Sequence, residues 1–222
     1  LMTLGHVGQI VPLLLSLEDE TGIAALLRGK TAVINLVGIL HGGARDFDAV
    51  HRAFPERLAR LSAAAGVKTL VHVSALGARE SSPSVYARSK AAGEKALRQH
   101  FPGAVIFQPS VVFGPEDDFL NRFAKMAMVS PALPLIGGGR TRFQPVYADD
   151  VALAIQMAAE DARHTGQTYV LAGPNVYTFK ELMTLMMTMT RRRRCLVPVP
   201  FPAAGLMGVF TGLLPNPPLT RD

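Results

Sequence analysis

Short apolar runs alternate along this chain with longer segments in which apolar residues recur at helical spacing. The runs that predict strands cover residues 9–15, 31–37, 69–73, 104–108 and 168–171. The segments that predict helices cover residues 19–27, 46–65, 84–100, 120–128, 151–160 and 179–189. Such alternation is typical of stacked βαβ units. We therefore predict an α/β protein with a doubly wound, mostly parallel sheet.

Three residues set expectations for local geometry. Pro55 interrupts the helical pattern of residues 46–65 and removes a backbone donor, which predicts a kink or a restarted helix. Gly66 follows that segment and is expected to end it. Asp150 precedes the pattern of residues 151–160 and is expected to cap that helix.

After Pro109 the regular alternation weakens. Pro and Gly interrupt every candidate helix up to residue 148 except the one over residues 120–128. A stretch of this kind predicts a small lobe over the functional site. The methionines of residues 179–189 (Met183, Met186, Met187 and Met189) are expected in a core or a contact surface.

The beginning of the chain lacks an element that a doubly wound nucleotide-binding domain needs. Such a domain opens with a strand, a glycine-rich turn and a helix that receives the pyrophosphate. Gly5 and Gly8 match only half of that glycine pattern, and Pro12 stands where the helix should begin. We therefore expect an N-terminally truncated Rossmann sheet, without its first βαβ segment.

Composition narrows the class of site and partner. Cys195 is the single cysteine among 222 residues and the six histidines are scattered, so we predict no metal site and a reducing compartment. Four of the charges behind the net +6 form one run, Arg191–Arg194, and basic residues do not interleave with aromatics, so we expect no nucleic-acid partner. The run is a solvated loop or, alternatively, a contact for anionic lipid head groups or a phosphate.

Apolar stretches are too short to predict a membrane span. None reaches the roughly 18 to 20 apolar residues that a transmembrane helix needs, and residues 201–214 suit a buried or interfacial helix. We expect a cytoplasmic protein, with peripheral contact at the inner face of the cytoplasmic membrane as the alternative.

The strongest chemical signal is YARSK, residues 86–90. Spacing of i, i+4 near the start of a helix puts Tyr86 and Lys90 on one face. A nearby ammonium favours the phenolate and is expected to lower the Tyr86 pKa, while Lys90 can hydrogen-bond ribose hydroxyls of a nicotinamide cofactor. The pair predicts an acid/base and cofactor site.

Six segments together resemble a known family. TAVINLVGIL, TLVHVSALGA, SVYARSKAAGE, PSVVFGPEDDFLNRF, LIGGGRTRFQPVYADDVA and GPNVYTF are similar to the NAD(P)-binding accessory subunits of respiratory complex I, which are atypical short-chain dehydrogenases/reductases. The resemblance implies a Rossmann domain that binds NADP or NAD, with NADPH favoured. Residues 1–112 are then a partial NAD(P)-binding domain, and residues 113–222 hold the remaining strand and helices and a small substrate or partner lobe of the same unit.

The resemblance also carries over residues around the adenosine half of the cofactor. Ser16 resembles the polar residue beside the adenine, with a loop hydroxyl as the alternative. The strand end whose backbone passes the adenosine is matched by Asn35, Leu36, Val37 and Gly38.

On the nicotinamide side, the resemblance places Ser74 and Ala75 where the ring is approached and makes Tyr86 and Lys90 the ribose and acid/base pair. The loop near the carboxamide is matched by Pro109, Ser110 and Val111. Catalytic relatives carry a Ser or Thr donor just beyond the strand, and that position is Ala75 here, with Ser74, the third catalytic candidate beside Tyr86 and Lys90, one residue off. Without the hydroxyl, stabilisation of an oxyanion is weakened.

These expectations leave three functions open. The first is an NAD(P)H-binding accessory or assembly subunit of a membrane-bound respiratory NADH:quinone oxidoreductase, in which the cofactor is mainly structural. The second is an active oxidoreductase or isomerase on a hydrophobic carbonyl or quinone-like substrate, whose apolar wall would contain Phe113, Phe119, Phe123, Met126 and Met128. The third is a sugar-nucleotide epimerase. We further expect this 222-residue chain alone to bind NADPH weakly or not at all, because the pyrophosphate site is missing.

Overall fold

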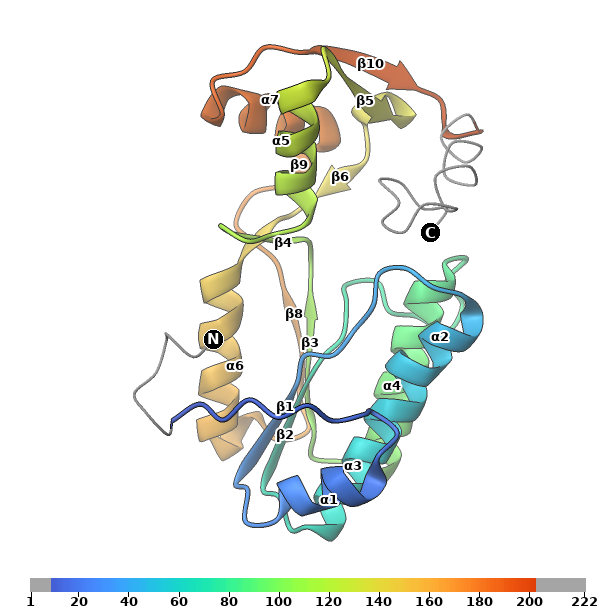
Figure 1. The fold of residues 1–222 in the computed structure, drawn as a ribbon, viewed down its shortest axis with the longest axis vertical. Coiled ribbons are helices and arrows are strands. Elements are labelled where there is room, and N and C mark those ends of the chain that lie inside the picture. The colour runs from blue at the N-terminus through green and yellow to red at the C-terminus, as the bar shows by residue number, and fades with distance from the viewer. Residues whose placement is uncertain (1–8, 203–222) are drawn as a thin grey trace.

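A four-stranded parallel sheet forms the centre of the computed structural model, which describes residues 9–202 (Figure 1). In the spatial order of the sheet, its strands are β1 (Ala32–Asn35), β2 (Thr69–Val73), β3 (Val105–Pro109) and β8 (Thr168–Leu171). All three pairings are parallel, so the carboxyl ends of the strands lie at one edge. The α/β class with a parallel sheet, predicted from the alternation, is confirmed.

Helices cover both faces of this sheet. On one face pack α1 (Glu20–Leu27), α3 (Phe54–Ala64) and α4 (Val85–His100), and on the other lies α6 (Ala148–Glu160) (Figure 1). Side chains of β2 alternate between the two cores, because successive residues of a strand point to opposite faces. Leu70 is buried with the first group of helices, whereas Val71 is buried with α6.

The predicted interruption at Pro55 is confirmed and takes a specific form. The segment runs as α2 (Ala44–Asp48), a π-helical turn η2 (Ala49–Ala53) and then α3, with Pro55 in the first turn of α3. Pro55 cannot donate to the carbonyl of residue 51, and in a regular helix its ring would collide with that carbonyl. The wider π turn relieves this clash. Gly66 follows α3 with φ +72°, as a helix-terminating glycine does.

Two local expectations are wrong. Residues 9–16 form no strand, and Leu13 and Leu14 are exposed. A strand needs a neighbour to complete its ladder of hydrogen bonds, and no strand within the described residues pairs with this segment. Asp150 does not cap α6, because the helix begins at Ala148, two residues before Asp150, with Tyr147 at the N-cap. Asp150 lies instead in the first turn, where a carboxylate favours the helix dipole.

A separate lobe lies beyond the carboxyl edge of the sheet (Figure 1). It contains α5 (Phe119–Val129), β5 (Ala132–Ile136), α7 (Phe179–Met189) and β10 (Cys195–Val199), and β5 pairs with β10 in parallel. Its own core includes Phe123, Leu133 and Met183. Two short ladders connect it to the sheet domain: β4 (Val112–Phe113) with β7 (Val146–Tyr147), and β6 (Arg142–Phe143) with β9 (Tyr177–Thr178). Two single turns complete the assignment, η3 (Gly137–Gly139) and η4 (Ala162–His164).

The methionine pattern of α7 divides between core and surface. Met183, Met186 and Met187 are buried in the lobe, while Met189 is 77% exposed. The helix expected over residues 201–214 lies, from residue 203 on, outside the described residues. Within residues 9–202, no helix combines the length and the apolar character that crossing a bilayer requires.

Candidate functional site

Helix α4 holds Tyr86 and Lys90 beside the end of β2. Its start is fixed at Ser84, whose side chain accepts a hydrogen bond from Ala87 N at 3.2 Å. Tyr86 lies in the first turn and Lys90 one turn later. The Lys90 side chain is buried, with Nζ 5.9 Å from the centroid of the Tyr86 ring and 3.4 Å from the carbonyl oxygen of Val73, to which it donates.

Burial dominates the electrostatics of this pair. It lowers the pKa of Lys90 to about 8, against a smaller opposing effect of Glu94. Burial also raises the pKa of Tyr86. The expected lowering of the Tyr86 pKa is therefore wrong, because burial disfavours the charged phenolate more strongly than the nearby ammonium favours it.

A directed chain of hydrogen bonds passes behind the tyrosine. Ile39 N donates to His51 Nε2 at 3.1 Å, so the proton of this ring is on Nδ1, which lies 2.9 Å from Ser89 Oγ. Ser89 Oγ in turn donates to the carbonyl of Tyr86 at 2.8 Å. The imidazole meets the Tyr86 ring edge to face, with centroids 5.3 Å apart. His51 thus connects the loop after β1 to the first turn of α4.

A second buried histidine fixes the end of β1. Asn35 Nδ2 lies 3.0 Å from His72 Nδ1, and Asn35 Oδ1 accepts from Val37 N at 3.0 Å. Asn35 is therefore more than a turn former, since it anchors both its own loop and the neighbouring strand. Burial lowers the pKa of His72 to about 3 and that of His51 to about 4, in both cases with a smaller contribution from the Lys90 charge.

The sequence reasoning missed both histidines. His72 interrupts the apolar run TLVHV, and His51 lies in the helical pattern ahead of Pro55. A polar residue in the middle of a buried strand is the one signal that was present, because buried polar groups need partners.

The loop after β1 brings backbone close to Lys90. A Cβ atom at Gly38 would lie 3.1 Å from Lys90 Nζ and 3.7 Å from His51 Nε2. Because glycine has no side chain, the space beside the Lys90 ammonium stays open, and a larger residue at position 38 would reduce it. Leu36 and Val37 precede Gly38, the first exposed and the second half-buried.

Ser74 and Ala75 follow β2 at the same edge. Ser74 N donates to Phe107 O at 2.7 Å, while its buried hydroxyl has no hydrogen-bond partner in the described part of the chain. Ala75 contributes no hydroxyl. The first residue after β2 thus carries a buried hydroxyl and the second carries none.

The loop after β3 borders the same edge and leads into the lobe. Leu76 N donates to Pro109 O at 2.9 Å, which ties this loop to the segment after β2. Ser110 N donates to Leu171 O at 2.8 Å, and Val111 O accepts from Val146 N at 3.0 Å. The structure thus places the loops after β1, β2 and β3 at one edge of the sheet, where Gly38 and Val73 lie beside Lys90.

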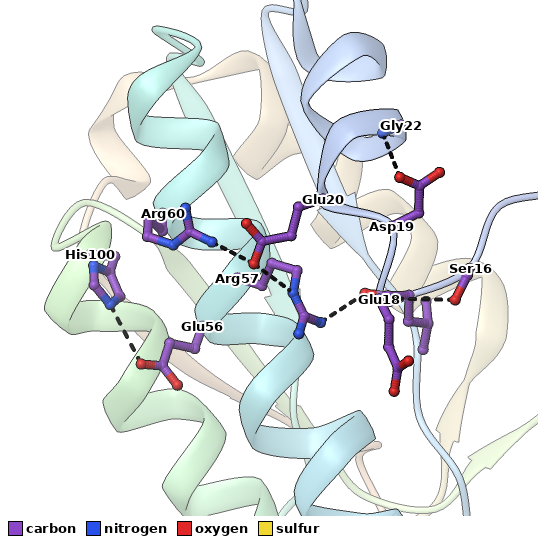
Figure 2. A network of polar contacts seen from close by, with 10 residues as sticks. Ser16, Glu18, Asp19, Glu20, Gly22, Glu56, Arg57, Arg60 and His100 are labelled. Atoms are coloured by element: carbon purple, nitrogen blue, oxygen red, sulfur yellow. Dashed lines mark hydrogen bonds and ion pairs between the residues drawn. The ribbon is translucent and has the colours of Figure 1, made fainter.

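Ser16 has a different setting, before α1. Its exposed hydroxyl accepts a hydrogen bond from Glu18 N at 3.2 Å (Figure 2). Nearby, Glu20 forms ion pairs with Arg57 and Arg60 of α3, at 3.2 and 2.7 Å. These two guanidinium groups lower the pKa of the Glu20 carboxyl. The contacts fasten α1 to α3, and Ser16 lies in the turn that precedes α1.

Two of the aromatic residues expected to line a substrate wall pack in the core of the lobe. Phe123 is buried and meets Phe179 at 5.2 Å between ring centroids, and Phe119 meets Phe123 at 5.6 Å. Both belong to the lobe core. No group of three His, Cys, Asp or Glu side chains suited to a metal ion occurs in residues 9–202.

Comparison with known families gives one match over most of the chain. The model of the NAD dependent epimerase/dehydratase family matches residues 13–172, the range that contains the whole sheet, α4 and the three loops.

Several curated relatives match nearly the entire chain, and two of them illustrate the likeness. The chain is 40% identical over 219 residues to "NADH dehydrogenase [ubiquinone] 1 alpha subcomplex subunit 9, mitochondrial" of Arabidopsis thaliana, which covers 97% of the chain and 54% of the plant protein. The mouse protein of the same name is 37% identical, over 99% of the chain and 59% of its own length. The chain therefore spans little more than half the length of these relatives.

Solved structures share the fold. The dTDP-glucose 4,6-dehydratase DesIV of Streptomyces venezuelae, with NAD and TYD bound, superposes with a TM-score of 0.75 at 23% sequence identity, covering 83% of this chain and 65% of that one. At this identity the likeness supports the expected Rossmann-type sheet and carries no argument about the reaction.

Proposed function

The chain belongs to the NAD dependent epimerase/dehydratase family, and we propose that the protein binds a nicotinamide dinucleotide and serves as an accessory or assembly subunit of a respiratory NADH:quinone oxidoreductase. One observation carries the cofactor part of this proposal. The buried ammonium of Lys90 lies at the carboxyl edge of the parallel sheet, and it has more N–H donors than acceptors within the described residues.

The geometry around Lys90 fits ribose hydroxyls. An ammonium has three donors, and within residues 9–202 Lys90 has one acceptor, the Val73 carbonyl at the long distance of 3.4 Å. Burying a charge with so few partners is costly unless a ligand completes its hydrogen bonds. Gly38 keeps the space beside Nζ open. In parallel α/β sheets, ligands bind outside the carboxyl ends of the strands.

Other residues of the site have matching roles. When bound, the nicotinamide ring supplies hydride chemistry. Lys90 would donate to the ribose, Asn35 and Gly38 would shape the backbone that passes the adenosine, and Tyr86 would present a neutral phenol near the ring. The loop of Pro109, Ser110 and Val111 would approach the carboxamide. NADPH rather than NADH is the cofactor that the family resemblance favours.

The cofactor is proposed to be mainly structural. The two residues after β2 offer Tyr86 no accessible hydroxyl to share the polarisation of a carbonyl, because Ala75 provides none and the Ser74 hydroxyl is buried. Losing one donor of this type costs about 3 kcal/mol of barrier in other enzymes. Such a loss reduces turnover strongly while the groups that hold the dinucleotide are unaffected.

Turnover assays test the structural role. The protein at its natural length would be incubated with NADPH and short-chain quinones, and compared with Tyr86→Phe. We expect no quinone-dependent oxidation of NADPH above background in either protein. Turnover by the wild type that the variant loses would contradict a structural cofactor and favour the oxidoreductase alternative.

The proposed partner and location rest on the curated relatives, whose names place them in NADH dehydrogenase. We propose that the protein lies at the inner face of the membrane, attached to the respiratory complex. A tagged protein of natural length, purified from detergent-solubilised membranes, should carry NADH:quinone oxidoreductase activity with it. Recovery of the tagged protein without that activity would contradict the assignment.

A further inference from the structure

Charge is distributed unevenly between the lobe and the rest of the chain. Residues 119–147 and 176–202 hold nine Arg and Lys residues and one acidic residue, Glu181. The remainder of the chain holds 14 basic and 16 acidic residues. The surplus of positive charge is therefore a property of the lobe, whereas the sheet domain is close to neutral.

The end of the lobe that lies farthest from the sheet combines this charge with exposed apolar side chains. Helix α5 ends there with Met128 and Val129, which are 61% and 87% exposed, and α7 ends there with Met189. The segment that joins α7 to β10 crosses the same extremity (Figure 1). It contains Arg191–Arg193, all exposed. We call Met128, Val129, Met189 and Arg191–Arg193 the lobe tip.

A defined turn holds the arginines of the lobe tip in place. Arg192 N donates to Met187 O at 2.8 Å and Arg191 N to Thr188 O at 3.1 Å, which is the Schellman pattern at a helix end. Arg191 takes the left-handed position of this motif, with φ 52°, where glycine is usual. Arg194 turns inward, with Nε donating to Ala127 O at 2.8 Å. This bond ties the run to the end of α5 and leaves Arg191–Arg193 outside.

We propose that the lobe tip is a docking surface for an anionic lipid bilayer. The proposal goes beyond the proposed function, since it needs neither the cofactor nor the respiratory complex. Guanidinium groups attract lipid phosphates, and the exposed Met and Val side chains would enter the head-group boundary. A nucleic-acid surface would interleave its basic residues with aromatics, and the lobe tip contains none. The left-handed Arg191 keeps a charge where glycine would be less strained, which favours a functional reason for the arginine.

Vesicle flotation of the intact chain tests this surface. We expect the protein to float with vesicles of phosphatidylcholine and phosphatidylglycerol and to remain behind with phosphatidylcholine alone. Each arginine near an anionic surface is worth about a fivefold gain in partitioning. Replacing Arg191, Arg192 and Arg193 by Gln should therefore weaken partitioning on the order of 100-fold.

The matched control removes the same charge at the other end of the molecule. Arg28, Lys30 and Lys68 are exposed near the amino ends of β1 and β2. Their triple Gln variant should float like the wild type. Equal losses in the two variants would show that net charge alone acts and would overturn the proposal, as would binding to neutral vesicles that the arginine variant retains.

The apolar half of the lobe tip is tested separately. Val129→Ser and Met189→Ser together should weaken flotation at least fivefold while all arginines remain. Unchanged flotation of this variant, with full displacement of the wild type by RNA, would identify a general polyanion surface and contradict the lipid assignment.

A fluorophore attached to Cys195 can report how the protein is oriented on the vesicle surface. Cys195 is the single cysteine, it is exposed, and it follows the arginine run. An environment-sensitive fluorophore on Cys195 should shift to the blue on addition of anionic vesicles. The same fluorophore on a Cys195→Ser, Lys30→Cys variant should not shift, and a shift there but not at Cys195 would overturn the proposed orientation.

Discussion

The carbonyl oxygen of His51 occupies the space in which a side chain at Gly93 would begin. A Cβ atom built on Gly93 would lie 1.8 Å from that oxygen, a distance that no real contact permits. The π turn forced by Pro55 places this carbonyl against α4, and glycine lets the two helices approach. The helix that carries Tyr86 and Lys90 is therefore positioned by backbone contact as well as by side chains.

Gly93→Ala should destabilise the fold by about 3 kcal/mol or more, because backbone on both sides resists displacement. Gly66→Ala is the matched control. It meets nothing within 4 Å and bears only the strain of φ +72°, so about 1 kcal/mol is expected. Urea unfolding midpoints measure both changes. Equal losses in the two variants would contradict the close approach of α4 to the π turn.

Acid should destabilise the protein through its buried histidines. The pKa values of His51 and His72, about 4 and about 3, lie below the ordinary 6.5. As pH falls from 6.5, the unfolded chain takes up protons before the folded one, so stability is full above pH 6.5 and declines below it. Each of the two histidines should lower the free energy of unfolding by about 2 kcal/mol as the pH falls from 6.5 to 5.

The measurement is the free energy of unfolding at pH 7, 6 and 5, a range in which most carboxylates stay ionised. His51→Gln should remove about half of the slope with pH, whatever its effect on absolute stability. An undiminished slope in that variant would show that other groups cause the acid sensitivity.

Arg191→Gly should stabilise the chain by about 1 kcal/mol, since glycine adopts φ 52° without the penalty that a side chain incurs. The same change should weaken flotation on anionic vesicles by about fivefold. Thermal unfolding and flotation of one preparation provide both numbers. A loss of stability on this substitution would be inconsistent with strain at Arg191.

The parallel sheet, the helix break at Pro55 and the Tyr86 and Lys90 pair were predictable from the sequence, because each depends on local spacing. The strand expected over residues 9–15 failed because a strand also depends on a neighbour, which the apolar pattern does not reveal. The pKa of Tyr86 was predicted in the wrong direction because spacing reveals the nearby charge but not the depth of burial. His51 and His72 escaped notice since their partners are distant in the chain.

Cofactor binding should depend on pH through Lys90, if the ammonium donates to the ribose. Its pKa of about 8 means that the charged form is present below pH 8 and is lost above it. Affinity of the natural-length protein for NADPH should therefore fall between pH 7 and 9. Lys90→Met should show weak affinity without this decline, and a decline of the same size in the variant would assign the titration to another group.

The dissociation constant for NADPH tests the central claim most directly, measured by titration calorimetry on the natural-length protein, on Lys90→Met and on Lys95→Met. Lys95 lies on the same helix but is exposed and paired with Glu80 at 2.9 Å, which makes it the matched control. A charge-assisted hydrogen bond is worth about 1.5 to 3 kcal/mol, so Lys90→Met should raise the constant roughly 10- to 100-fold, with Lys95→Met unchanged. Equal constants for the wild type and Lys90→Met would contradict a dinucleotide site at this lysine.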